Sequence, residues 1–148
     1  MNAVNFFNKE EKELIKSAVK EAELNTSGEI RVHLDNNCRE DVMDRAAWWF
    51  GKLEMHETEL RNGVLFYLAV KDRKFAILGD AGINAVTPDD FWDHIREIML
   101  ARFSEGDFAS GLREGILMAG QALKEHFPYQ EGDINELSDE ISFGGKQQ

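Results

Sequence analysis

The spacing of apolar residues changes along the chain, and each change marks a predicted element. Over residues 8–24 apolar side chains recur every three or four positions, which is the spacing of one face of a helix. Asn8 is a good N-cap, and Glu11 stands in the capping-box position three residues later. From Ile30 to Leu34 the pattern becomes a strict alternation, which predicts a strand with one drier face.

The middle of the chain predicts a helix and two strands. Apolar residues return to helical spacing from about Arg39 and fade by His56. Residues 64–70 are apolar without alternation, which is typical of a central strand buried on both faces. A short polar turn leads into residues 75–78, so the two runs most simply pair as an antiparallel hairpin. Residues 79–87 are expected to form a loop.

Two helices are predicted in the last third of the chain. Thr87 as N-cap, Pro88 at the first helical position, and Asp89 and Asp90 in the first turn indicate the start of the third helix. An apolar stripe over residues 108–127 predicts the fourth helix.

The order of elements predicts the fold class. A strand, a helix and a strand between residues 30 and 70 call for a parallel crossover, and the hairpin adds an antiparallel strand. We therefore expect an α/β fold with a small mixed sheet flanked by about four helices. We expect residues 1–130 to form a single domain and residues 131–148 to form an acidic, turn-rich and partly flexible tail, which Leu137, Ile141 and Phe143 hold loosely against the domain.

Composition narrows the range of partners. The 148 residues carry 28 acidic and 17 basic side chains, a net charge of −11. This balance argues against nucleic acid and anionic membranes and favours the attraction of cations. The longest uncharged run in the middle of the chain, residues 62–70, is far shorter than the roughly 20 residues of a spanning helix, so no membrane insertion is expected. Because the chain has one cysteine, Cys38, and no apparent targeting segment, a cytoplasmic location is expected.

Contiguous catalytic motifs are absent from the sequence. The segment that begins at His56 and Glu57 starts like a zinc metalloprotease helix but has Leu60 where the second histidine belongs. The segment from Gly79 to Gly82 lacks the third glycine of a dinucleotide-binding loop and the Lys-Ser/Thr pair of a phosphate-binding loop.

One constellation of polar residues follows from the predicted topology. If the hairpin is antiparallel and the crossover parallel, then Glu29, Asn62 and Asp80 lie at the same edge of the sheet. Asp89 and Asp90 follow at the next helix start, and backbone carbonyls of the 79–87 loop add further oxygens. Such a set suits a hard divalent cation, Ca²⁺ or Mg²⁺, and the adjacent Arg61 suits an anion such as phosphate.

Structural roles compete with each of these functional interpretations. Asp89 and Asp90 are typical helix-capping residues, and Asp80 with Gly82 is typical of a turn. Glu29 at a strand start is more often solvated than coordinating. The dispersed histidines, His33 among them, are interpreted as surface or partly packed side chains.

Several short segments resemble the TPM domain family. They are Arg61-Asn62-Gly63-Val64-Leu65, Gly79-Asp80-Ala81-Gly82-Ile83, Phe91-Trp92, Phe103-Ser104-Glu105-Gly106-Asp107-Phe108 with Gly111-Leu112, Gly115-Ile116, Phe127-Pro128, and the segment of residues 135–141. The last of these is similar to the tail of the short, soluble bacterial branch of the family.

The resemblance implies a compact sheet flanked by helices and, for function, two activities. Some members of the family bind divalent cations in an acidic cleft, which carries over to Asn62 and Asp80 and less directly to Asp89 and Asp90. A weak acid phosphatase activity is also assigned within the family. Our first hypothesis is a soluble Ca²⁺- or Mg²⁺-binding domain with a protein partner.

Two alternatives remain open beside the cation-binding hypothesis. One is a metal-assisted phosphatase that acts on phosphate monoesters, in which Arg61 offsets developing charge and Asp80 orients or deprotonates water. The other is a metal-free protein-interaction scaffold, in which the acidic surface serves solubility alone.

Overall fold

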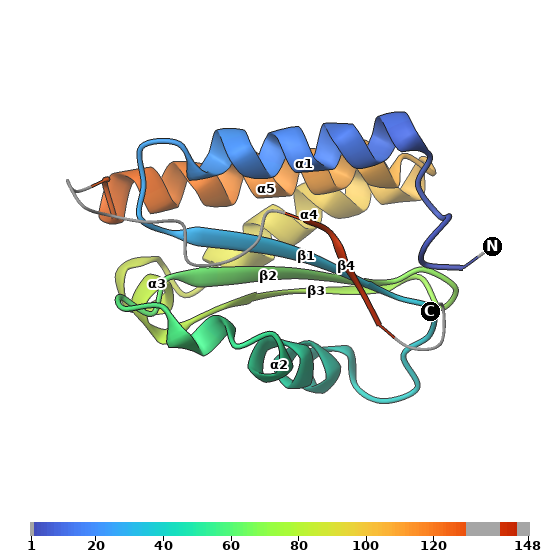
Figure 1. Cartoon of the computed structure of the whole chain (residues 1–148), viewed down its shortest axis with the longest axis horizontal. Helices are drawn as coiled ribbons and strands as arrows, with labels where there is room; N and C mark the ends of the chain where they lie inside the picture. The colour runs from blue at the N-terminus through green and yellow to red at the C-terminus, as the bar shows by residue number, and fades with distance from the viewer. Residues whose placement is uncertain (1, 130–139, 145–148) are drawn as a thin grey trace.

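A four-stranded sheet has helices packed on both of its faces (Figure 1). The computed structural model describes residues 2–129 and 140–144. The elements in chain order are α1 (Lys9–Glu23), β1 (Glu29–Asp35), α2 (Val42–Lys52), the 3-10 helix η1 (Met55–Glu57), β2 (Gly63–Ala69), β3 (Lys74–Gly79), α3 (Ala81–Val86), α4 (Phe91–Ser104), α5 (Phe108–His126) and β4 (Ser142–Phe143). The predicted α/β class is therefore confirmed.

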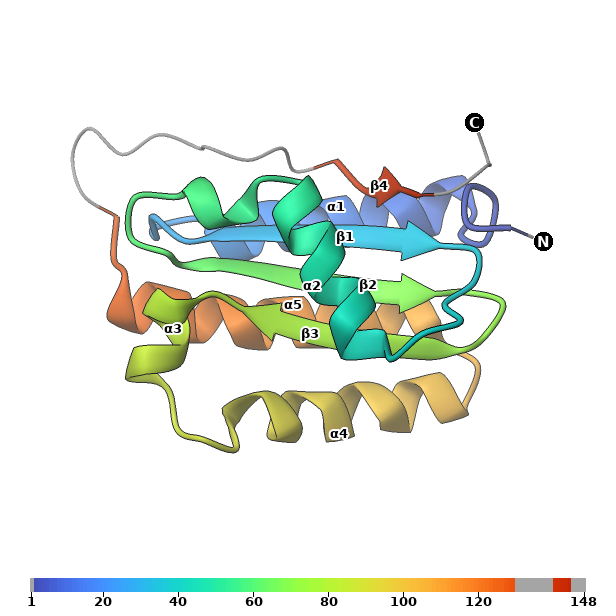
Figure 2. The ribbon, with the colours of Figure 1, turned by 90° about the horizontal axis from the view of Figure 1, so that it is seen from below.

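The strand order β3-β2-β1-β4 contains the predicted crossover and hairpin. β1 pairs with β2 in parallel, with Glu29 opposite Gly63, and α2 makes the crossover between them. β2 pairs with β3 in the antiparallel direction, with Val64 opposite Gly79. Figure 2 shows α2 crossing this sheet on the face opposite α1, α4 and α5.

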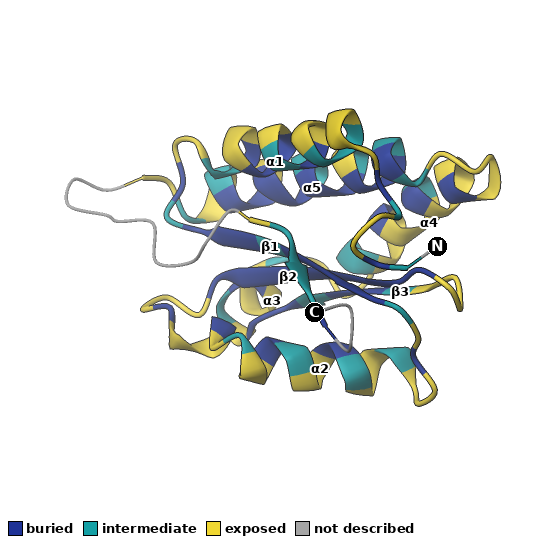
Figure 3. Ribbon diagram, turned by 45° about the vertical axis from the view of Figure 1, so that its right-hand side comes forward, coloured by how far each residue is buried: buried dark blue, intermediate teal, exposed yellow. Residues whose placement is uncertain are grey.

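β2 is buried at every position, as its unbroken apolar run predicts. The hydrophobic core is divided by the sheet into two parts. The larger part lies under α1, α4 and α5 and contains Val64, Phe66 and Leu68 of β2. The smaller part lies under α2 and contains Leu65 and Tyr67. Figure 3 shows that the buried stripes of the helices face the sheet.

The helix ends follow local chemistry. Asn8 caps α1 as predicted, because its side chain accepts from the Glu11 backbone amide and the Glu11 carboxylate accepts from the Asn8 amide. Glycines allow close helix packing: a Cβ at Gly115 would meet Met99 Sδ at 2.5 Å, and one at Gly120 would meet the Cβ of Ala22 at 2.6 Å.

The structure corrects several expectations about the segment that follows β3. Residues 79–87 are not a loop, because Asp80 caps the short helix α3. Thr87 is the C-cap of α3 rather than the N-cap of α4, and its hydroxyl donates to the Ile83 carbonyl. α4 begins at Phe91, with Asp90 as an N-cap whose side chain makes no capping hydrogen bond.

Two other features differ from the sequence pattern. Both faces of β1 are covered. Its alternation therefore separates an apolar face from a polar face, and the polar face is not exposed to solvent as the sequence pattern predicted. The C-terminal segment adds a strand, β4, whose Ser142 and Phe143 pair in parallel with His33 and Leu34. Of the residues predicted to hold the tail, Leu137 lies outside the described residues, while Ile141 and Phe143 pack against the larger core.

None of the described helices is long and apolar enough to cross a lipid bilayer.

Candidate functional site at the acidic end of the sheet

The strand register brings three buried polar residues to one end of the sheet. Glu29 begins β1 opposite Gly63, and the Asp80 amide donates to the Gly63 carbonyl at 2.9 Å. The relative solvent exposures of Glu29, Asn62 and Asp80 are only 3%, 1% and 7%. We call this set the acidic end of the sheet. The backbone convergence predicted from topology is confirmed.

Asp80 forms an ion pair with Arg61 through both of its oxygens. Arg61 Nε donates to Oδ2 and Nη2 donates to Oδ1, each at 2.7 Å, which is the parallel fork geometry that guanidinium and carboxylate groups favour. The Ala81 amide also donates to Oδ1 at 2.7 Å. Burial alone would raise the pKa of Asp80, but these hydrogen bonds outweigh it and lower the pKa below its usual value. Asp80 is therefore held as a carboxylate.

The backbone around this ion pair is tightly fitted. Arg61 adopts a left-handed conformation, with φ of 53°, and its carbonyl accepts from the Gly82 amide at 2.7 Å. A Cβ at Gly82 would overlap the carbonyl oxygen of Leu60 and lie 2.5 Å from that of Arg61. Glycine is required here because the start of α3 lies against these two carbonyl groups.

Asn62 connects the acidic end to neighbouring loops. Its side-chain amide donates to Ser27 Oγ at 3.2 Å, and its backbone amide donates to Thr58 Oγ1 at 3.3 Å. Its carbonyl accepts from the Glu29 amide at 3.4 Å. Asn62 thus joins the start of β1 to the segment before β2, and these hydrogen bonds hold its backbone and side chain in place.

Asp89 and Asp90 lie apart from these three residues in the chain, because α3 intervenes between them and Asp80. Both side chains are exposed. Among residues 2–129 and 140–144, no three His, Cys, Asp or Glu side chains are grouped closely enough to hold a metal ion. The oxygen-bearing side chains of the acidic end are therefore two carboxylates, Glu29 and Asp80, and one amide, Asn62.

A second polar cluster, centred on Asp35, was missed by the sequence interpretation. Tyr67 Oη donates to Asp35 Oδ2 at 2.6 Å, and Trp49 Nε1 donates to the same oxygen at 2.9 Å. His33 Nε2 lies 3.4 Å from Oδ1, and Arg45 Nε lies 3.5 Å from Oδ2. We call these five residues the Asp35 network.

Burial and hydrogen bonding set the protonation states in the Asp35 network. Burial would raise the pKa of Asp35, but the hydrogen bonds from His33, Tyr67 and Trp49 outweigh it and lower the pKa. Burial lowers the pKa of His33, and Asp35 opposes this shift only in part. Burial and the neighbouring carboxylate raise the pKa of Tyr67. The network therefore holds an ionised carboxylate and a tyrosine hydroxyl at neutral pH.

The C-terminal segment closes over the Asp35 network. Ser142 Oγ lies 2.6 Å from His33 Nδ1, and the Gly144 amide donates to the Leu34 carbonyl at 3.0 Å. A Cβ at Gly144 would overlap Asp35 Oδ1 and Trp49. His33 is fully buried, contrary to its interpretation as a surface or partly packed side chain. The one signal in the sequence was Tyr67, a hydroxyl within an otherwise apolar strand.

Comparison with known proteins gives a family and a set of similar folds. A family model described as the TPM domain matches residues 1–122. No curated protein matches the chain. The NMR structure of BA42 protein from the psychrophilic bacterium Bizionia argentinensis is 50% identical, with a TM-score of 0.87, and the match covers 94% of this chain and 96% of that one.

Two more distant structures share the fold. The N-terminal domain of cg2496 protein from Corynebacterium glutamicum is 14% identical, with a TM-score of 0.64 over 80% of this chain and 75% of that one. The N-terminal domain of a protein from P. gingivalis is 21% identical, with a TM-score of 0.66 over 84% of this chain and 83% of that one.

Proposed function

Because the chain belongs to the TPM domain family, we propose that it is a divalent-cation-binding domain that takes Ca²⁺ or Mg²⁺ at the acidic end of the sheet. The observation that carries the proposal is the burial of Glu29, Asn62 and Asp80 together at the ends of three adjacent strands. The chain as a whole carries a net charge of −11, which favours the attraction of cations to this end of the sheet. The cytoplasm is the compartment that we propose for it.

The donor chemistry fits a hard cation. Ca²⁺ takes six to eight oxygen ligands from carboxylates, amides, backbone carbonyls and water, and Mg²⁺ takes six while keeping several waters. Glu29 and Asp80 would supply carboxylate oxygens, Asn62 its amide oxygen, and the Leu60 carbonyl beside Gly82 a further oxygen. Asp89 and Asp90 are not needed in this set.

Arg61 is the counter-ion of Asp80 in this structure, and it competes with a cation for the same oxygens. Its side chain is 51% exposed, whereas that of Asp80 is 5% exposed and is fixed by the Ala81 amide. Exchange of Arg61 for a metal ion therefore requires only a rotation of the exposed partner. We expect this competition to weaken cation binding, so that the position of the Arg61 side chain sets the affinity of the site for the cation.

The test is a titration of chelator-treated protein with Ca²⁺ and, separately, with Mg²⁺, followed by backbone amide NMR shifts. We expect saturable shifts at Glu29, Asn62 and Asp80. Asp80→Asn should weaken binding at least about tenfold, because it removes the charge from a ligand. Arg61→Asn, which tolerates the left-handed backbone, should strengthen binding by freeing Asp80.

The matched control is Asp89→Asn, which removes the same charge from an exposed carboxylate outside the site. It should leave the affinity unchanged. Equal losses in Asp80→Asn and Asp89→Asn, or small shifts spread over the acidic surface without saturation, would contradict the proposal and favour a metal-free protein-interaction scaffold. A partner that binds only in the presence of the cation would extend the proposal to a protein interaction.

A metal-assisted phosphatase is the second candidate, and the half-exposed guanidinium of Arg61 beside a buried carboxylate favours it. Arg61 uses Nε and Nη2 on Asp80, so Nη1 remains to hold a phosphoryl oxygen. The lowered pKa of Asp80 makes it a weak base, so it would orient water rather than deprotonate it. Hydrolysis of an aryl phosphate that persists unchanged in Arg61→Asn and Asp80→Asn would exclude this assignment.

A further inference from the structure

A pocket of about 290 Å³ lies at the opposite end of the sheet from Asp80, where the N-terminal segment meets the β2–β3 turn and the start of α5. It is lined by Phe6, Phe7, Glu11, Arg73, Gly106 and Phe108. Its volume is at the low end of the range for small-molecule sites, which favours a small ligand. None of these residues belongs to the acidic end or to the Asp35 network.

Aromatic rings form the walls of the pocket. The rings of Phe6 and Phe7 meet edge to face at 4.9 Å between centroids, and Phe6 and Phe108 do so at 5.3 Å. Phe108 in turn stacks on Phe103 at 4.8 Å. Phe7 is buried and Phe6 and Phe108 are half-buried, so the rings are fixed from behind and present edges and faces to the pocket.

Arg73 lies on one side of these rings with its guanidinium held over them. Its Cζ is 4.9 Å from the centroid of Phe108 and 5.8 Å from that of Phe6. In the described part of the chain no carboxylate pairs with Arg73. The one acid of its turn, Asp72, accepts instead from the Cys38 amide at 2.7 Å. A guanidinium stacked on rings keeps its N–H edge for a planar anion such as a carboxylate.

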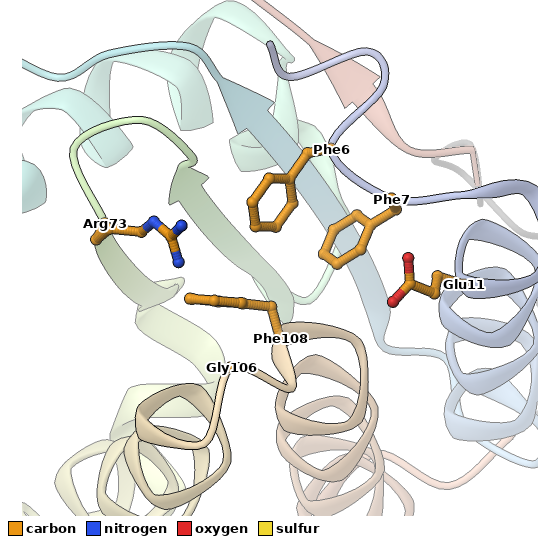
Figure 4. A pocket seen from close by; sticks show the side chains of 6 residues that line it. All are labelled: Phe6, Phe7, Glu11, Arg73, Gly106 and Phe108. Atoms are coloured by element: carbon orange, nitrogen blue, oxygen red, sulfur yellow. The ribbon is translucent and has the colours of Figure 1, made fainter. Parts of the chain in front are cut away.

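Glu11 lies on the other side of the rings, as Figure 4 shows. Its Oε1 accepts from the Asn8 amide at 2.9 Å, so the capping box fixes the carboxylate in place. No basic side chain within residues 2–129 and 140–144 forms an ion pair with it. Its remaining oxygen is an acceptor for an ammonium group.

We propose that this pocket binds a small zwitterion with a flat apolar body, whose carboxylate pairs with Arg73 and whose ammonium group pairs with Glu11. A simple anion would meet repulsion from Glu11, and a simple cation would meet repulsion from Arg73. The phenylalanine rings suit an aromatic or unsaturated body between the two charges. The site is independent of the proposed cation site.

The test uses 4-(aminomethyl)benzoate as the probe, with benzoate and benzylamine as the analogues that each lack one charge. Binding is followed by NMR shifts of the Gly106 amide and of the Phe6 and Phe108 rings. We expect saturation with a dissociation constant on the order of 1 mM, as for a ligand of this size. Each analogue should bind about three- to tenfold more weakly.

Matched variants separate the pocket from the general charge of the surface. Glu11→Gln keeps the capping box and should weaken the zwitterion about three- to tenfold while leaving benzoate unweakened. Asparagine tolerates the left-handed backbone of Arg73, at φ 55°. Arg73→Asn should weaken binding of the zwitterion by the same factor while leaving the binding of benzylamine unweakened. The controls Glu10→Gln and Lys71→Gln remove the same charges from neighbouring residues that do not line the pocket.

Two results would overturn the proposal. One is the absence of saturable shifts at Gly106, Phe6 and Phe108 up to tens of millimolar probe. The other is an equal effect of each control and its matched pocket variant, because that would show surface charge rather than a built site. Loss of zwitterion binding confined to Glu11→Gln and Arg73→Asn supports it.

Discussion

Replacement of Tyr67 by phenylalanine tests whether the Asp35 network stabilises the fold. Tyr67 is 1% exposed, and its hydroxyl donates to Asp35 Oδ2 at 2.6 Å. Tyr67→Phe removes only the hydroxyl oxygen and keeps the ring. Unlike truncation of the side chain to alanine, it therefore leaves no large cavity in the core. Asp35 keeps the Trp49 hydrogen bond and the nearby His33 and Arg45.

The expected loss is the value of a hydrogen bond to a charged acceptor. Such bonds contribute about 1.5–3 kcal/mol, because the buried carboxylate loses a donor that water cannot replace. For a chain of this length, about 1 kcal/mol lowers the melting temperature by roughly 3 °C. We therefore expect urea unfolding at pH 7 to show that loss in free energy, and thermal unfolding to shift down by about 5–9 °C.

The loss should depend on pH with a definite sign. The folded-state pKa of Asp35 is lowered, so its contribution is present above the unfolded value of 3.8 and is lost as the pH falls through the folded pKa. The difference between the variant and the parent should therefore be largest at neutral pH and shrink in acid. Tyr129→Phe, at a residue 55% exposed, is the control and should change stability by less than about 0.5 kcal/mol.

A loss below about 0.5 kcal/mol at pH 7, or a loss that does not change with pH, would refute this reasoning. Either result would mean that Trp49 and the other donors satisfy Asp35 without Tyr67.

Three further predictions concern single positions. Gly82→Ala places a methyl group against the Leu60 and Arg61 carbonyl groups, so we expect a loss of more than about 3 kcal/mol, or no folded protein, by circular dichroism and urea unfolding. Gly51→Ala, in the interior of α2 with nothing within 4 Å of the added Cβ, should instead raise the free energy of unfolding by about 0.5–1 kcal/mol; a loss there would contradict the open space around it. Because burial lowers the pKa of His33 below 6.5, the unfolded chain binds the proton first, and stability should fall by at most about 1.4 kcal/mol per pH unit as the pH drops below 6.5; His33→Gln should flatten this slope in urea titrations from pH 7 to pH 5.

The sequence was sufficient for elements whose signals are local. The Asn8 capping box marks the start of α1, and the continuous apolar run of β2 marks a strand buried on both faces. Each of these patterns lies within the segment whose structure it predicts. The crossover and hairpin then placed Glu29, Asn62 and Asp80 at one end of the sheet. That inference needed only strand directions.

Features that depend on partners distant in the sequence were not predicted. Asp80 was interpreted as a loop residue, whereas it caps α3 and pairs with Arg61, nineteen residues earlier in the chain. The residue types of positions 87–90 are typical of a helix start. Thr87 is instead the C-cap of α3, and α4 begins only at Phe91. His33 and Asp35 read as an outward face because α2 and residues 142–144, which bury them, lie elsewhere in the sequence.

β1 would be an open edge of the sheet without three separate contacts along its outer side. The Glu23 carboxylate accepts from the Ile30 amide at 2.7 Å, Ser142 Oγ donates to the Val32 carbonyl at 3.4 Å, and the Gly144 amide donates to the Leu34 carbonyl. An exposed strand edge is a template for pairing with another chain and for aggregation. A side chain from α1 and residues 142–144 thus cover part of this edge, and we expect that a truncation before Ser142 would expose it and favour association with other chains.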